Sequence, residues 1–158
     1  MTLCVRPAAR DDVAAILSFI RDLADYEQLL DQAVVTEADL ARDLFGPNPR
    51  AFCDIAEDHG APVGFALWFY SYSTFVGRHG IYLEDLFVAP QARGEGAGVA
   101  LIAGLARRCV AEGLGRLEWA VLDWNASAIG FYDRLGAAAM DGWTVRRLTG
   151  EALARLAG

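Results

Sequence analysis

Apolar residues recur along this chain with two different periods, and the period predicts the type of element in each region. Alternation over Leu3–Pro7 predicts a first strand. Spacings of three and four residues then predict a helix from about Asp11 to Tyr26, with its apolar side chains on one face. A second helix is predicted from Thr36, which opens a sequence close to a capping box, to Phe45.

Strands and turns dominate the middle of the chain. Ala51–Glu57 and Val63–Tyr72 predict two strands joined by a tight turn, and the polar stretch that follows predicts a loop. A third strand is predicted over Ile81–Val88, which is strongly apolar but carries Glu84 and Asp85. Because side chains alternate between faces along a strand, we expect these two carboxylates to point to opposite faces.

The second half of the chain begins with a glycine-rich segment, Gln91–Gly98, that leads into a helix ending near Gly113. A strand is predicted over Leu117–Val121, a helix over Ser127–Leu135, and a strand over Trp143–Leu148 before a short terminal helix. Neither a repeat nor a linker interrupts this order. The sequence therefore predicts one α/β domain over residues 1–158, with a mixed sheet flanked by helices.

Charge narrows the classes of partner. The chain carries 14 Lys and Arg against 21 Asp and Glu, a formal net charge of −7. A negative surface repels phosphate backbones, so we expect no nucleic-acid partner and a preference for cations. The apolar runs are shorter than the roughly 20 residues of a membrane span, and residues 1–10 lack the pattern of a signal peptide.

Cysteine and histidine content argues against a metal site. Cys4, Cys53 and Cys109 have no metal-ligand spacing and are typical of small buried residues in a reducing compartment. His59 and His79 each adjoin a glycine in an expected turn. We therefore expect a cytoplasmic protein without a metal.

The glycine-rich segment is the main chemical signal. A strand, then Arg93–Gly98, then a helix places backbone N–H groups at a positive helix end, where a phosphate binds well. A P-loop is excluded because Val99 and Ala100 stand where it needs Lys and Ser or Thr. A dinucleotide fingerprint is excluded because it needs glycine where Val99 or Leu101 stands.

Further stretches accompany this segment in a fixed order: Arg6–Ala8, Leu23–Glu27, Thr36–Leu40, Val63–Ala66, Tyr82–Val88, Asp123–Asn125 and Phe131–Ala137. With the glycine-rich segment, they resemble the diamine (spermidine/spermine) acetyltransferase branch of the GNAT superfamily over nearly the whole chain. The resemblance implies a strongly curved mixed sheet, acetyl-CoA as co-substrate, and transfer of acetyl to an amine. It also implies a homodimer.

An amine acetyltransferase must remove a proton from its substrate, because a primary ammonium has a pKa of about 10.4. By resemblance, Glu84 is the candidate base, acting through water, and one anchor of the cationic substrate. Tyr132 is the candidate acid that protonates the departing CoA thiolate. It follows Asn125 by seven residues, an interval of about two helical turns.

The resemblance also assigns the cofactor contacts. The backbone of Leu86, Phe87 and Val88 is expected to pair with the pantetheine arm as an added strand. The pyrophosphate is expected to bind Arg93 and the loop formed by Gly94, Glu95, Gly96, Ala97, Gly98 and Val99. Asn125 and Tyr132 are expected to contact the cofactor as well.

By resemblance, Tyr26, Glu27 and Glu84 lie where this branch contacts its amine substrate. Trp119 and Asp141 are further candidates, because acidic residues with aromatic neighbours can hold a cation by charge and cation–π contact. A diamine or polyamine is the expected acceptor, and attack is expected to be direct in a ternary complex. The turn Asp58–Ala61 and the segment Gly136–Trp143 are shorter than the family pattern, which leaves the chain length of the amine open. Alternatives are a thialysine-like amino acid, an aminoglycoside-like compound, or a non-catalytic acetyl-CoA-binding module.

Overall fold

A five-stranded mixed sheet is the frame of the computed structural model, which describes residues 2–158. Its strands lie in the order β1-β2-β3-β4-β5, and neighbours are antiparallel except for β4 and β5, which are parallel. The strands are β1 (Leu3–Pro7), β2 (Phe52–Asp58), β3 (Ala61–Ser73), β4 (Arg78–Val88) and β5 (Leu117–Glu118). The predicted mixed α/β fold is confirmed.

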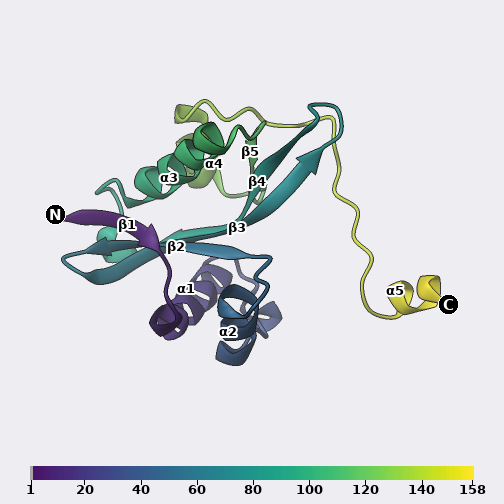
Figure 1. Cartoon of the computed structure of the whole chain (residues 1–158), viewed down its shortest axis with the longest axis horizontal. Coiled ribbons are helices and arrows are strands. Elements are labelled where there is room, and N and C mark those ends of the chain that lie inside the picture. The colour runs from purple at the N-terminus through teal and green to yellow at the C-terminus, as the bar shows by residue number, and fades with distance from the viewer. Residues whose placement is uncertain (1) are drawn as a thin grey trace. The chain divides into compact units, whose positions relative to one another are not determined.

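Helices cover both faces of this sheet. Figure 1 shows α1 (Val13–Tyr26) and α2 (Glu37–Phe45) on one face and α3 (Ala97–Glu112) on the other. Short 3-10 turns at Arg10–Asp12, Leu30–Gln32 and Pro90–Ala92 connect the elements. None of the described helices is long and apolar enough to cross a membrane.

The described chain divides into two compact units. The first ends at Ala120 and contains the sheet with α1, α2 and α3. The second, Val121–Gly158, contains α4 (Ala126–Arg134) and α5 (Gly150–Ala157).

Aromatic packing holds α1 against β3 and β4. The Phe19 ring lies 5.8 Å from the Phe65 ring and 5.9 Å from the Phe87 ring, measured between centroids. Phe65 is fully buried, as are Ile16 of α1 and Ile55 of β2. Each aromatic side chain removes on the order of 150–250 Å² from water, so this cluster dominates the packing of α1 on the sheet.

An ion-pair network fixes the beginning of α1. The Arg6 guanidinium on β1 donates hydrogen bonds to both oxygens of Asp12 at 2.7 and 2.9 Å, and to Glu57 on β2 at 2.7 Å. Hydrogen bonds from Arg6, and from the backbone N–H of Ala9, hold the pKa of the buried Asp12 carboxyl below its ordinary value. The helix therefore starts from a fixed point at the edge of the sheet.

Three differences separate the structure from the predicted elements. The loop expected before Ile81 is instead mostly paired, because β3 runs to Ser73 and β4 already begins at Arg78. The strand after Leu117 ends at Glu118. No strand forms over residues 143–148, because alternation of apolar side chains makes a strand only where a partner supplies hydrogen bonds.

Cysteine and histidine positions agree only in part with expectation. Cys53 and Cys109 are buried, but Cys4 is exposed, and all three are free. His59 lies in a turn with φ of 50°. His79 is part of β4 rather than a turn, and its ring lies 4.9 Å from the Tyr72 ring across the β3–β4 pair.

Gly64 permits the close approach of β3 and β4 beside Val88. A Cβ at this position would lie 2.6 Å from the Phe87 carbonyl oxygen and 3.3 Å from the Val88 side chain. Gly64→Ala is therefore expected to lower the free energy of unfolding by about 1–3 kcal/mol, measured by urea denaturation. Gly142→Ala is the control, because a Cβ there meets nothing within 4 Å. An equal effect of both substitutions would contradict the prediction.

Candidate active site

The register of β4 against β3 slips by one residue at Glu84. Leu67 lies opposite Asp85, whereas Trp68 lies opposite Leu83, so Glu84 is an extra residue in β4 and forms a β-bulge. Leu83 and Asp85 consequently lie on opposite faces, although residues two apart share a face in a regular strand. The expectation that Glu84 and Asp85 point to opposite faces stays a prediction, while Glu84 is exposed and Asp85 is half-buried.

Three carboxylates gather beside this bulge, those of Glu27, Glu84 and Asp85. Burial, together with the negative charges of Glu84 and Glu27, raises the pKa of Asp85 to about 6. Burial also raises the pKa of Glu27, the residue that directly follows α1. The sequence predicted Glu27 and Glu84 as substrate contacts. Asp85, for which the sequence suggested a structural role, joins them in this group on the side of β4 that faces α1.

Arg93 joins the glycine-rich loop to the end of α1. Its Cζ lies 5.4 Å from the centroid of the Tyr26 ring and 5.5 Å from that of the Phe87 ring. Its Nε donates a hydrogen bond of 2.9 Å to the carbonyl oxygen of Val88. These ring distances are those of cation–π contacts. A residue predicted for the cofactor and one predicted for the amine are thus neighbours.

β4 and β5 separate just before the bulge. Within the described residues they pair only at Ile81 with Leu117 and at Tyr82 with Glu118. The β4 edge that continues through Leu86–Val88 therefore has no β5 partner, and its backbone groups suit an extended ligand that adds as a further strand. Trp119 directly follows β5 at this point of separation.

The loop before α3 has the geometry that a pyrophosphate requires. Gly94 and Gly96 adopt φ of 81° and 90°, which favours glycine at both positions. Gly96 is the N-cap of α3, with no side-chain cap hydrogen bond, and no acidic residue lies in the first turn. The N–H groups of that turn, in Ala97, Gly98 and Val99, are thus left for an anion at a positive helix end. These residues fit a CoA pyrophosphate, although Glu95 adds one exposed negative charge to the loop.

The second unit carries the remaining predicted site residues. Asn125 is the N-cap of α4, and its Oδ1 accepts a hydrogen bond of 3.2 Å from the Ala128 N–H. Tyr132 lies on the same helix, and its ring is 5.4 Å from that of Phe131. Asp141 is exposed in a segment without regular secondary structure. The cap predicted for Asn125 is confirmed, while the roles of Tyr132 and Asp141 stay predictions.

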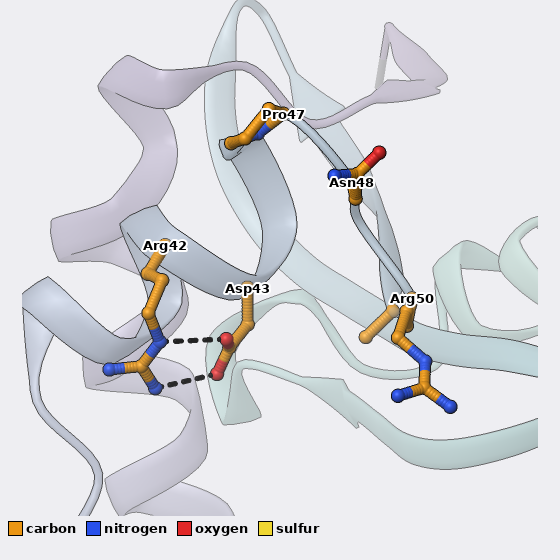
Figure 2. A pocket seen from close by; sticks show the side chains of 6 residues that line it. Arg42, Asp43, Pro47, Asn48 and Arg50 are labelled. Carbon is orange, nitrogen blue, oxygen red and sulfur yellow. Dashed lines mark hydrogen bonds and ion pairs between the residues drawn. The ribbon is translucent and has the colours of Figure 1, made fainter.

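A hollow lies at the end of α2 in the first unit. It has a volume of about 410 Å³ and is lined by Arg42, Asp43, Pro47, Asn48, Arg50 and Ala51. Figure 2 shows Arg42 turned toward Asp43, to which it donates hydrogen bonds of 2.9 and 3.0 Å. None of the predicted site residues lines this hollow. Across residues 2–158, no three His, Cys, Asp or Glu side chains are grouped to hold a metal ion.

Known proteins are similar to this chain in both sequence and fold. The model of the acetyltransferase (GNAT) family matches residues 16–137. Thialysine N-epsilon-acetyltransferase of Bos taurus is 42% identical over 165 residues, which cover 98% of this chain and 96% of the relative. L-ornithine N5-acetyltransferase of Arabidopsis thaliana is 30% identical, covering 94% of this chain and 85% of the relative.

A solved structure extends the likeness to three dimensions. An integron cassette protein from the mobile metagenome of V. cholerae superimposes with a TM-score of 0.83 and 26% identity, covering 99% of this chain and 98% of that protein. The family model spans most of the chain, and the relatives match nearly all of it. The chain therefore belongs to the GNAT acetyltransferase family, and it is an N-acetyltransferase.

Proposed function

We propose that this enzyme transfers the acetyl group of acetyl-CoA to the side-chain amine of a lysine-like or ornithine-like amino acid. The observation that carries the proposal is the group of Glu27, Glu84 and Asp85 beside the open edge of β4. These negative charges would attract a cationic amine toward the edge of β4 whose backbone is suited to pantetheine. Relatives named for thialysine and for L-ornithine support this class of acceptor.

Glu84 is proposed to act on the proton of the amine. Only a fraction of about 10⁻³ to 10⁻⁴ of a primary amine is unprotonated at neutral pH. Glu84 is exposed at the bulge, so water can pass the ammonium proton to its carboxylate. Glu27 and Asp85 add negative charge that holds the ammonium before this transfer. The deprotonated nitrogen then bonds to the acetyl carbonyl carbon as the bond from that carbon to sulfur breaks, and the nitrogen releases a second proton to water.

Tyr132 is proposed to supply the proton that the departing sulfur takes up. Acetyl-CoA contributes an activated thioester, and release of its thiol completes the transfer. The buried thiols of Cys53 and Cys109 are poor nucleophiles, because burial raises the pKa of both. Direct attack by the amine in a ternary complex is therefore preferred to an acetyl-cysteine intermediate.

The cofactor is proposed to span the open edge of β4 and the beginning of α3. Leu86–Val88 would pair with the pantetheine, and Arg93 with the first N–H groups of α3 would hold the pyrophosphate. Asn125 and Tyr132 remain proposed contacts of the cofactor. Tyr26, Trp119 and Asp141 remain proposed contacts of the amine, in addition to the three carboxylates.

A diamine such as spermidine is the second candidate acceptor. The stretches Tyr82–Val88 and Phe131–Ala137 resemble the diamine acetyltransferase branch and favour it. Both acceptors present the same terminal ammonium to the carboxylates. The acetyl-transfer chemistry is therefore common to the two candidates, which differ at the other end of the molecule.

We also propose that residues 1–158 work as one catalytic domain in a cytoplasmic homodimer. The C-terminal segment exposes Met140, Trp143 and Val145, apolar side chains of the kind that a second copy covers. The resemblance to homodimeric acetyltransferases supports the same arrangement. Free cysteines are typical of a reducing compartment.

The acceptor is tested by following CoA thiol release with thialysine, L-ornithine, spermidine, a short diamine and an aminoglycoside. We expect the highest kcat/KM with thialysine or L-ornithine. Turnover of spermidine without turnover of thialysine or L-ornithine would show that the acceptor is a polyamine and not an amino acid. Tight binding of CoA without transfer to any amine would favour a non-catalytic module and overturn the proposal.

Tyr132→Phe tests the acid. Removing the hydroxyl is expected to lower kcat about 10²- to 10⁴-fold, the range typical of general acid–base catalysis. The dissociation constant of CoA, measured by calorimetry, is expected to change less than about twofold because the ring is retained. Tyr72→Phe, at an exposed position in β3, is the matched control. Unchanged turnover in Tyr132→Phe would exclude the role.

Asp85 makes stability depend on pH. Its pKa is about 6 in the folded protein, against an ordinary value near 3.8, so the folded state binds a proton that the unfolded state lacks between these values. Stability therefore falls as pH rises from about 4 through 6. The free energy of unfolding of Asp85→Asn, measured by urea denaturation, is expected to exceed that of the wild type by up to about 3 kcal/mol at pH 7.5. At pH 4 the two proteins are expected to differ little.

Asp22→Asn is the control for this measurement. Asp22 is an exposed aspartate on α1, and its substitution is expected to change stability by less than about 0.5 kcal/mol at either pH. A stability gain in Asp85→Asn that is equal at both pH values would show that the ionisation of Asp85 is not the cause.

A further inference from the structure

Arg93 is held by the protein itself at the place where two ligands would meet. Its Nε donates a hydrogen bond of 2.9 Å to the Val88 carbonyl oxygen. Its Cζ lies 5.4 Å from the centroid of the Tyr26 ring and 5.5 Å from that of the Phe87 ring. Tyr26 ends α1, and the next residue is Glu27 of the carboxylate group. The Arg93 guanidinium therefore already lies over the Tyr26 ring beside these carboxylates.

The proposed function requires this guanidinium and this ring for different ligands. Arg93 would pair with the pyrophosphate, and Tyr26 would contact the ammonium of the acceptor. A guanidinium over the Tyr26 ring occupies a face that a substrate cation would use, since both are attracted by the same ring quadrupole. Two cations at one ring face also repel each other.

We infer that Arg93 is an internal competitor of the substrate cation, released from Tyr26 when the pyrophosphate binds. Acetyl-CoA then opens the ring face beside Glu27, and the amine binds more tightly after the cofactor than before it. The coupling is reciprocal, so a bound amine also favours the cofactor. This inference rests on the proposed function and concerns the order in which its two substrates bind.

The first test measures CoA affinity by calorimetry in a double-mutant cycle. Tyr26→Leu removes the ring that retains Arg93 and is expected to tighten CoA binding about 2- to 5-fold, the equivalent of one exposed cation–π contact. Tyr26→Phe keeps the ring and is expected to bind CoA as the wild type does. In an Arg93→Gln background, Tyr26→Leu is expected to have no effect. Acetylpantetheine, which lacks the pyrophosphate, is expected to bind wild type and Tyr26→Leu equally.

Two results of this cycle would overturn the inference. Unchanged CoA affinity in Tyr26→Leu would show that the ring does not compete for the guanidinium. Weaker CoA affinity would show that Tyr26 positions Arg93 for the pyrophosphate instead of withholding it. A protein that bound no CoA in any form would overturn the proposed function together with the inference.

The second test titrates thialysine and spermidine in the absence and presence of saturating CoA. In the wild type, saturating CoA is expected to lower the dissociation constant of whichever amine binds by about 2- to 5-fold. In Arg93→Gln this dependence is expected to disappear. Equal amine affinity with and without CoA in the wild type would overturn the inference while leaving the acetyl-transfer proposal intact. Failure of both amines to bind, with the CoA cycle as expected, would instead overturn the proposed acceptors.

Discussion

The β-bulge at Glu84 is the constraint on which the site depends, because β4 has to serve two cores on opposite faces of the sheet. Leu83 lies opposite Trp68, whose ring is covered by Arg108 of α3, whereas Phe87 packs with Phe19 of α1. Leu83 and Phe87 are four residues apart and would share a face in a regular strand. One extra residue between them sends each to its own core, since a slip of one residue exchanges the faces.

The same extra residue concentrates negative charge. Asp85 is turned toward α1, where burial, together with the charges of Glu84 and Glu27, raises its pKa to about 6. Like charges held close together in a partly buried place destabilise the folded protein, and a bound cation relieves them. A cluster that costs stability in the free protein is a common property of a binding or catalytic site. The bulge therefore joins a packing requirement to a chemical one.

Much of the framework could be predicted from the sequence, because it depends on local signals. The glycine-rich segment, the helix that follows it and the cap at Asn125 are encoded by residues within a few positions of one another. The bulge is not, because it depends on the pairing of β4 with β3, and only the partner register reveals the extra residue. The contact of Arg93 with Tyr26 joins residues 67 positions apart and has no local signal. The strand predicted over residues 143–148 was wrong for the opposite reason. Its local pattern is that of a strand, but no described strand pairs with it.

The charge arrangement also bears on which nitrogen of an amino acid would be acetylated. A lysine-like acceptor carries an α-ammonium beside an α-carboxylate, and a side-chain ammonium with no negative neighbour. Glu27, Glu84 and Asp85 attract both ammonium groups but repel the carboxylate, and this repulsion is strong at short range in a partly buried site. The side-chain ammonium can therefore approach the carboxylates at a lower free energy than the α-ammonium can. The names of the relatives, which specify N-epsilon and N5 transfer, agree with that direction of binding. A diamine has no carboxylate, so the same three residues would admit it by either end, and the other end of the site must decide between the two classes of acceptor.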